Sequence, residues 1–443
     1  MDNLMSKFES FLMPIAEKIT GNRYLSAIKE GFFGATPILI AGSIFLLFTS
    51  IPIDGYAEFM EKTFSSNWMD FFYIPYQASF KLMAVFVVIG AAKSLAEYYE
   101  VDVKLAAALT LVGVFILTPI IVSEVGVKGL PIDNLSAAGL FVCLIVTFIS
   151  VEIYRYCVHR GFTIKMPESV PQNVSTAFAA VIPAFIIIML FNVIRLAFSL
   201  TDYASAQAFI FDILQQPLQS LGGTLPATVL VLLLESVIWC FGLHGSSIVS
   251  SVMNPIWYAQ SAENLAAAEA GLALPNIVNY QFIAHFVKIG GVGATLGLSI
   301  LCLFRAKSEQ YKALGKLSIG ASIFNINEPV IFGFPIILNP MMMIPFVLSN
   351  VLVGVVTYLA ISSGLVPMIN GVNLPYTLPV IISGFMLCGV QGATLQVVLL
   401  AMTTAIYFPF FTVQDRQVYQ RELENKKEKE LESKKDLELE TQS

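Results

Sequence analysis

The chain has 443 residues, of which 56% are hydrophobic and 13% are charged, and its mean hydropathy is +0.75. This composition excludes an ordinary soluble domain and predicts a protein of the membrane class. The net charge of −6 is unevenly spread, because the last 29 residues hold 7 of the 25 basic and 9 of the 31 acidic residues. Net charge therefore gives no indication of a nucleic-acid partner, and we expect none.

No metal, cofactor or nucleotide site is predicted. The five cysteines occur singly in or beside apolar runs without CxxC spacing, so we expect each to pack as a small hydrophobic side chain. Neither an HExxH motif nor a Walker lysine motif occurs, so we expect no bound metal and no nucleotide hydrolysis by the chain itself. The cysteines are Cys143, Cys157, Cys240, Cys302 and Cys388.

In the first half of the chain, the sequence predicts an amphipathic N-terminal helix followed by membrane spans. Apolar residues from Leu4 to Ile19 recur at helical spacing among charged residues, which is typical of a helix on the membrane surface. A span needs roughly 20 apolar residues. An amphipathic stretch, 204–221, is expected to lie in the interface. The spans predicted before it are 32–51, 74–95, 105–122, 137–154 and 174–200.

The second half is less regular. A sixth span, 225–243, ends at His244. The later apolar runs contain many glycines and prolines, so we expect broken helices there. These runs are 282–304, 317–338, 341–361, 377–388 and 393–411.

Basic residues predict the orientation of the chain. Alternate loops hold 13 lysines and arginines, whereas the loops between them hold only Lys62 and Lys128. Cytoplasmic loops carry the excess, so both termini are predicted to be cytoplasmic. Segment 305–316 is then cytoplasmic, while 362–376 has no basic residue. Two apolar runs separate these segments where an odd number of crossings is required, so one run must enter and leave on the same face.

The run containing Glu328 is the better candidate for this re-entrant hairpin. Pro329, Gly333 and Pro335 spoil it as a spanning helix. An ionised carboxylate is expensive in hydrocarbon, so Glu328 is predicted to line a polar pathway.

A second polar group follows the sixth span, in the sequence WCFGLHGSS at 239–247. His244 and the serines suit the binding of hydroxyl groups, although a helix end with a satisfied histidine explains this segment equally well. Glu235 is nine residues from His244, about 900° of helix, so we expect a structural role for it, for example pairing with Arg195. Asn279 ranks above Lys288 and His285 as a candidate, because those two side chains are equally compatible with an interface.

Four sequence motifs resemble those of a known family. They are IKMPESVP at 164–171, the His244-Gly245 turn, FNINEPVIFGFP at 324–335 and Asn339-Pro340. Together they resemble the membrane-embedded IIC component of bacterial sugar phosphotransferase systems, in the lactose/cellobiose/diacetylchitobiose group, over roughly residues 5 to 412. The resemblance implies an all-α homodimer in the cell membrane, with about ten spanning helices and two re-entrant hairpins. It also implies transport of a β-linked disaccharide by alternating access.

The resemblance also assigns site residues and a partner. Glu328 and His244 are implied to contact and activate the sugar 6-hydroxyl, and Asn327 and Asn279 to complete the binding of the sugar. Tyr376 stands where the family has a stacking tryptophan; by itself it also suits an interfacial anchor. The phosphoryl donor is implied to be a phosphocysteine on a separate cytosolic IIB protein.

The expected organisation is an interfacial segment at 1–31, a dimerisation half at 32–222, a sugar-binding half at 223–412 and a charged tail at 413–443. We expect the tail to be a solvated helix rather than a docking site for the partner. An ion-coupled sugar transporter with Glu328 as its proton site fits the broken helices equally well. A membrane-bound enzyme acting on lipid or glycan does not, because a self-contained catalytic set is missing.

Overall fold

The computed structural model describes residues 21–49, 55–65, 67–122, 126–167, 170–334, 336–337 and 339–440. Helices make up most of these residues, and the strands β1 (Ile121–Val122) and β2 (Lys128–Gly129) pair antiparallel. The surface helix predicted from Leu4 to Ile19 lies outside the described residues.

The chain divides into two compact units that alternate along the sequence. Unit 1 comprises Met1–Thr228, Ser246–Gln281 and Met368–Pro375, and unit 2 comprises Val229–Gly245, Phe282–Pro367 and Tyr376–Ser443. Unit 1 thus includes two segments beyond the contiguous first half that the sequence predicts. Gln260 connects the first of these segments to the first half, because its Nε2 donates to the carbonyl oxygen of Gln219 at 2.8 Å. Asn264 joins the two segments to each other, because its Nδ2 donates to the carbonyl oxygen of Ile369 at 2.8 Å.

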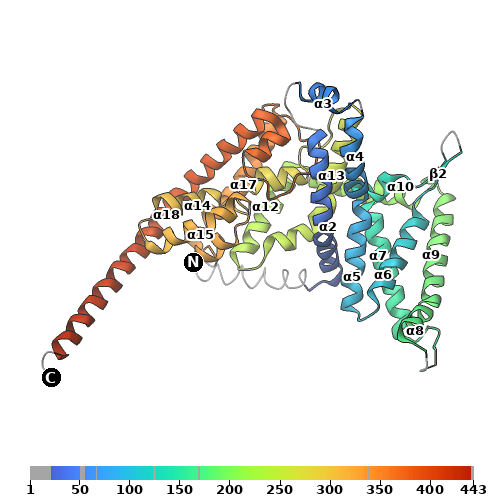
Figure 1. Cartoon of the computed structure of the whole chain (residues 1–443), viewed down its shortest axis with the longest axis horizontal. Coiled ribbons are helices and arrows are strands. Elements are labelled where there is room, and N and C mark those ends of the chain that lie inside the picture. Colours follow the sequence, from blue (N-terminus) through green and yellow to red (C-terminus); the bar gives the residue numbers. More distant parts are fainter. Residues whose placement is uncertain are drawn as a thin grey trace. The chain divides into compact units, whose positions relative to one another are not determined.

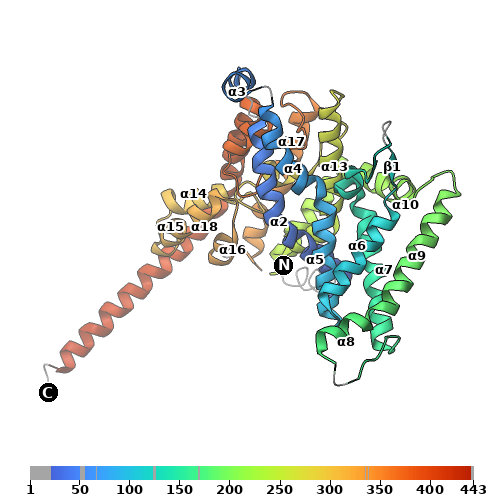
Figure 2. The same cartoon turned by 45° about the vertical axis from the view of Figure 1, so that its right-hand side comes forward.

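Unit 1 is built on long apolar helices that run side by side (Figures 1 and 2): α2 (Arg23–Thr49), α5 (Met83–Tyr98), α6 (Val103–Leu117), α7 (Leu140–His159) and α9 (Val181–Ser199). Glycines bring them close, as in membrane bundles generally. A Cβ added to Gly90 of α5 would lie 2.9 Å from Cα of Gly31 on α2, and one added to Gly113 of α6 would lie 2.7 Å from the ring of Phe191 on α9.

Shorter elements complete unit 1: α3 (Tyr56–Phe64), α4 (Trp68–Ser79), η1 (Phe80–Leu82), η2 (Ile132–Leu135), η3 (Ala137–Gly139), α8 (Gln172–Ala179), α10 (Ala206–Ile210), η4 (Phe211–Gln215), α11 (Gln216–Gly222) and α13 (Gly245–Glu269), whose first residue belongs to unit 2. One predicted boundary is wrong. The span expected over 105–122 ends as a helix at Leu117, because Pro119 cannot continue the α6 hydrogen-bond ladder, and the chain turns into β1.

Unit 2 holds α12 (Leu225–Cys240, from Val229 onward), η5 (Phe282–Val287), α14 (Leu296–Arg305), α15 (Glu309–Ile323), α16 (Glu328–Gly333), α17 (Pro340–Ser362) and α18 (Ile382–Glu440). Helices α14 and α15 pack together, and α14 packs on α18 (Figures 1 and 2). Their core is rich in aromatic side chains, including Trp239, Tyr311, Phe334, Phe346, Tyr407 and Phe411.

Some of the breaks expected in the second half are present, but the runs 341–361 and 393–411 lie in unbroken helix despite Pro345 and Pro409. The run 282–304 divides into the π-helical η5, a loop at 288–295 and α14. Helix α18 is interrupted at Cys388 and Gly389, and Gly389 has φ 62° and ψ −152°, a conformation that favours glycine. In the loop at 288–295, Gly291 has φ 93°, and a Cβ there would lie 2.3 Å from Cγ of Asn327. Backbone conformation and packing therefore both require glycine at 291.

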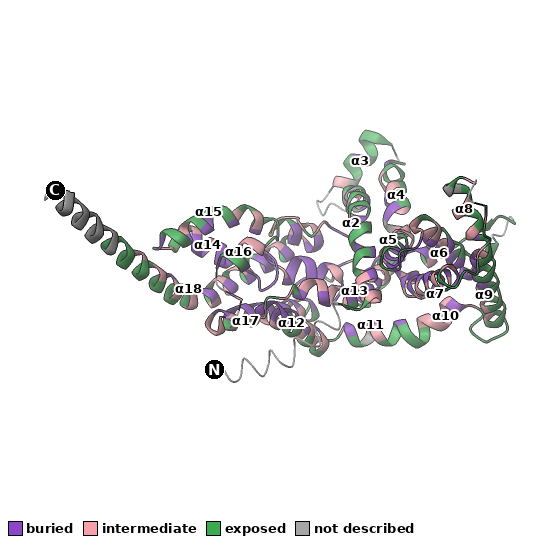
Figure 3. Cartoon of the chain, turned by 90° about the horizontal axis from the view of Figure 1, so that it is seen from below, coloured by how far each residue is buried: buried purple, intermediate pink, exposed green. Residues whose placement is uncertain are grey.

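Five described helical stretches are long and apolar enough to cross a bilayer: Trp68–Tyr98, Ala137–His159, Val174–Ser199, Pro340–Ser362 and Ile382–Lys427. Helix α9 leaves much of its apolar surface uncovered (Figure 3), with Phe185, Val193 and Leu196 all more than half exposed. Such a surface suits contact with lipid chains rather than water.

Candidate functional site

The junction between α12 and α13 positions His244. Helix α12 ends at Cys240, and Gly242, with φ 80°, turns the chain so that α13 starts at Gly245. The amides of Gly242 and Leu243 donate back to the carbonyl oxygens of Trp239 (2.9 Å) and Ile238 (3.3 Å). These bonds satisfy the end of α12 without using the imidazole. The half-exposed His244 side chain makes its ion-pair contact with another segment of unit 2.

That contact is with Glu328. The Nε2 atom of His244 lies 3.8 Å from Oε1 of Glu328, and the two side chains are 51% and 45% exposed. The indole of Trp239 packs on the imidazole with ring centroids 4.4 Å apart, while Trp239 itself is 2% exposed. A buried indole thus orients a half-exposed histidine towards a half-exposed carboxylate.

The second oxygen of Glu328 is the more informative. Its Oε2 atom is shielded from solvent, and the structure records no hydrogen-bond partner for it within the described part of the chain. A shielded carboxylate oxygen without a donor costs about 1–3 kcal/mol or more. The half-exposed Glu328 side chain can still accept a hydrogen bond from a ligand hydroxyl group, so the geometry suits a hydroxylated ligand beside it.

Asn325 holds the segment that carries Glu328. It adopts φ 60°, and its Oδ1 accepts from the amide of Gly290 at 2.9 Å. Its Nδ2 donates to the carbonyl oxygens of Tyr376 (2.7 Å) and Leu378 (3.1 Å). One buried amide therefore connects the segment before α16 to the glycine loop and to the segment before α18.

Asn327 is buried next to these hydrogen bonds and does not lie at the surface of the site. Its side chain is 4% exposed, and its Nδ2 donates to the carbonyl oxygen of Val292 at 2.7 Å. This bond fixes the residue next to Glu328 against the glycine loop. A direct contact between Asn327 and a sugar stays a prediction.

The other two predicted residues differ in exposure. Tyr376 is 42% exposed and belongs to unit 2, where its carbonyl is bound by Asn325. Asn279 is fully buried in unit 1, where its Nδ2 lies 3.5 Å from the carbonyl oxygen of Ile369. The structure therefore joins His244 and Glu328 directly, links Tyr376 to the same segment through Asn325, and records Asn279 within its own unit.

Glu235 forms a buried ion pair that the sequence did not identify. Its fully buried carboxylate lies 2.9 Å from Nζ of Lys288. The suggested partner, Arg195, instead donates to Asn192 on its own helix at 3.2 Å. Pairing with Arg195 is therefore wrong. Lys288 follows the π turn of η5, and this places its ammonium beside α12.

Two more buried side-chain amides, which the sequence did not single out, connect the helices of unit 2. Asn350 of α17 accepts from the amide of Gly293 (3.2 Å) and donates to Oγ of Ser236 (2.8 Å). Gln396 of α18 accepts from the amides of Ile381 (2.6 Å) and Gly384 (2.9 Å). Both amides are fully buried in otherwise apolar helices. That isolation within an apolar run was the available signal.

In the described ranges, no group of three or more His, Cys, Asp or Glu side chains is arranged to hold a metal ion. The polar groups beside Glu328 instead suit recognition of a neutral, hydroxylated molecule through hydrogen bonds.

Comparisons with known proteins identify the family. The family described as "Phosphotransferase system, EIIC" matches residues 29–349. The lichenan permease IIC component of Bacillus subtilis (strain 168) is 40% identical over 95% of this chain and 96% of its own length. The cellobiose-specific EIIC component of Geobacillus stearothermophilus is 40% identical over 94% of this chain and 95% of its own.

A solved structure supports the same family. The transporter ChbC, the IIC component of an N,N'-diacetylchitobiose-specific phosphotransferase system, is 40% identical and superposes with a TM-score of 0.89 over 94% of this chain and 98% of that one. The lactose-specific EIICB component of Lacticaseibacillus casei is longer: the match, at 31% identity, covers 94% of this chain but 72% of that protein. The chain belongs to the EIIC family of membrane permeases of the phosphotransferase system.

Proposed function

We propose that the protein is a IIC permease that moves a β-linked disaccharide, diacetylchitobiose or cellobiose, across the cell membrane by alternating access. It then presents the 6-hydroxyl of the sugar to a separate IIB protein. The observation that carries the site is the pair of half-exposed side chains, His244 and Glu328, which face each other at 3.8 Å. The names of the cellobiose and diacetylchitobiose relatives support the class of substrate.

Glu328 and His244 are proposed to share the chemistry. Glu328 accepts a hydrogen bond from the 6-hydroxyl and takes its proton as the oxygen attacks phosphorus. The new O–P bond forms while the S–P bond of the phosphocysteine breaks, so the thiolate leaves on the IIB protein. His244 stabilises the developing negative charge. Asn327, Asn279 and Tyr376 are proposed to hold the rest of the sugar.

The phosphoryl donor is proposed to be another protein. All five cysteines of this chain are buried, so an internal phosphocysteine is disfavoured. The extra length of the EIICB relative fits a fused IIB part that this chain would meet as a separate partner.

The proposed topology has about ten spans, both termini in the cytoplasm, and re-entrant hairpins around 324–339 and 377–389. The short helix α16 and the interruption of α18 at Gly389 support the hairpins, because irregular backbone at membrane depth requires a protein or water-filled surrounding. We also propose a homodimer formed through the first half of the chain.

Sugar binding by the purified protein tests the substrate. A panel of cellobiose, lactose and diacetylchitobiose should give saturable binding of at least one β-linked disaccharide. Glu328→Gln and His244→Ala should each weaken that binding about ten- to hundredfold, the loss of one charge-assisted hydrogen bond. Glu309→Gln, at an exposed carboxylate on α15, is the matched control and should bind like the parent. Uptake driven by a proton gradient in vesicles without IIB would instead favour an ion-coupled transporter.

A further inference from the structure

A polar pocket lies in unit 2 where α18 leaves its apolar half. It has a volume of about 560 Å³ and opens between the end of α14 and the charged part of α18. Its lining combines the apolar side chains of Phe408, Phe411 and Leu423 with the polar side chains of Tyr419 and Gln420. This size is in the range of small-molecule sites. None of the residues assigned to sugar binding lines it.

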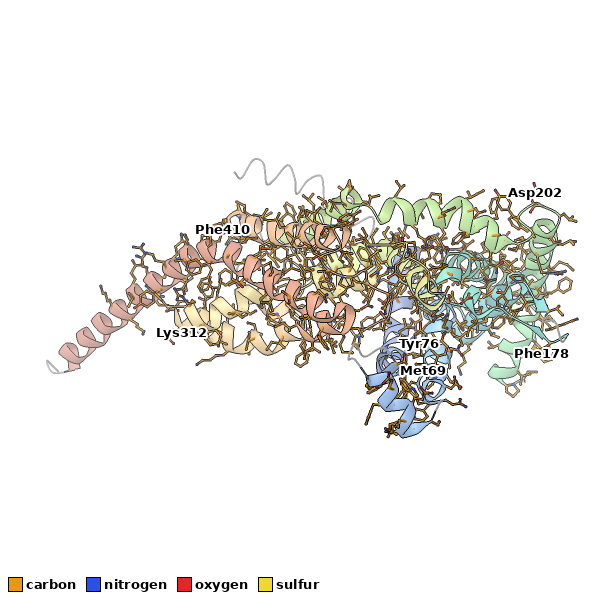
Figure 4. The ribbon with its side chains drawn as sticks, turned by 90° about the horizontal axis from the view of Figure 1, so that it is seen from above. Met69, Tyr76, Phe178, Asp202, Lys312 and Phe410 are labelled. Carbon is orange, nitrogen blue, oxygen red and sulfur yellow. The ribbon has the colours of Figure 1, made fainter. Side chains whose placement is uncertain are left out.

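Three cations line this pocket: Arg305, Lys307 and Arg416. All three are exposed, and the structure records no ion pair for them within the described ranges. The neighbouring Lys312 differs, because its Nζ lies 2.8 Å from Glu309 and its side chain extends away from the adjacent helices (Figure 4). That hydrogen bond also lowers the pKa of the exposed Glu309 carboxyl.

The one carboxylate in the lining of the pocket, Asp415, accepts hydrogen bonds from the chain itself. Asp415 is 4% exposed and accepts from the amides of Lys307 (2.8 Å) and Ser308 (3.0 Å) and from Oγ of Ser308 (2.7 Å). Two turns further along α18, Glu422 accepts from the amides of Glu309 and Gln310, both at 3.0 Å. These bonds fix α18 to the start of α15, so the pocket has rigid walls and an excess of positive charge.

We propose that this pocket binds the phosphate of an anionic phospholipid headgroup. The three cations suit a phosphodiester, and Arg305 already packs 5.8 Å from the ring of Phe408. The aromatic wall continues into the apolar half of α18, where an acyl chain would lie. A soluble phosphoprotein offers the anion without the chain, so the mixed lining favours lipid. Tyr419, in the same lining, is a residue type typical of the interface between headgroups and water.

Lipid binding by the full-length, delipidated protein tests the proposal. Native mass spectrometry should detect phosphatidylglycerol retained more strongly than phosphatidylcholine, and phosphatidylglycerol should raise the thermal unfolding temperature. The variant combining Arg305→Gln, Lys307→Gln and Arg416→Gln should lose this preference, with affinity for phosphatidylglycerol falling at least about tenfold. The combination of Lys104→Gln, Lys165→Gln and Lys316→Gln removes the same charge from exposed sites elsewhere and should bind like the parent.

Four outcomes would overturn the assignment. Equal retention of both lipids by the parent, or an unchanged preference in the pocket variant, would exclude a specific headgroup site. Stabilisation of the parent by inorganic phosphate to the same extent as by phosphatidylglycerol would identify a simple anion site. A pocket variant that keeps its lipid preference but loses affinity for phosphorylated IIB would show that the surface docks the partner. Unchanged sugar binding by the variant is the check that it folds, and the lipid result does not depend on the proposed transport function.

Discussion

Glu328 and its neighbour Asn327 have different environments although they are adjacent in sequence. Glu328 is half-exposed, faces His244 and has a shielded oxygen without a donor, whereas Asn327 is buried and bonded to Val292. Residue type alone could not show which of the two contacts a ligand and which stabilises the surrounding loops, because both side chains are polar and lie in the same apolar run. The hydrogen bond from the Asn327 side chain to the carbonyl oxygen of Val292 makes the distinction.

The ion pair between Glu235 and Lys288 leads to a stability prediction. Lys288→Met should destabilise the protein by about 3–5 kcal/mol, because it leaves the fully buried Glu235 carboxylate without its counter-ion. Glu235→Gln combined with Lys288→Met should recover part of that loss. Thermal unfolding in detergent measures both. Lys93→Met, which breaks an exposed pair with Glu97, should change stability by less than about 1 kcal/mol, and an equally large loss there would remove the special role of the buried pair.

Asn350 gives a second residue-scale prediction. Asn350→Ala should cost about 1–3 kcal/mol, since it leaves the buried amide of Gly293 and the hydroxyl of Ser236 without this partner. Asn192→Ala, on the exposed side of α9, should cost little by the same unfolding measurement. Equal effects of the two substitutions would contradict the support role of Asn350.

At the scale of elements, the glycine loop before α14 is the least replaceable segment around the site. Gly291→Ala should destabilise unit 2 and weaken sugar binding, because its φ is 93° and the new Cβ would meet Asn327. We expect a loss of about 1–3 kcal/mol in thermal unfolding. Gly320→Ala on α15 is the control: no atom lies within 4 Å of its added Cβ, so a neutral or slightly stabilising effect is expected. A neutral Gly291→Ala would contradict the close approach.

The sequence predicted elements better than it predicted their contacts. Hydropathy located the apolar runs, because it is a property of neighbouring residues. Glycines and prolines indicated the breaks in the runs 282–304 and 377–388 but wrongly predicted breaks in 341–361 and 393–411, which are continuous helix. The sequence missed the end of α6 before Pro119 and the partner of Glu235. The bonds of Asn264, Asn325 and Asn350 join segments far apart in the chain, so no local pattern encodes them. The sequence suggested a polar site around Glu328 and His244, whereas their direct contact at 3.8 Å is known only from the structure.

For the whole molecule, the alternation of basic loops predicts a topology that can be measured. Lys312→Cys should react with a membrane-impermeant thiol reagent only from the cytoplasmic face, and Lys62→Cys only from the opposite face. The five native cysteines are buried, so background labelling should be low. Labelling of both positions from the same side would contradict the predicted orientation.

Glu328 is proposed to act as both ligand and base, and phosphoryl transfer from phosphorylated IIB to bound disaccharide tests this double role most directly. At a sugar concentration high enough to saturate the more weakly binding Glu328→Gln variant, the variant should still slow transfer by about 10²–10⁴-fold, because the amide accepts a hydrogen bond without taking a proton. Glu309→Gln should transfer at the parent rate. Transfer by Glu328→Gln at the parent rate would contradict the account and leave Glu328 as a hydrogen-bonding residue at most.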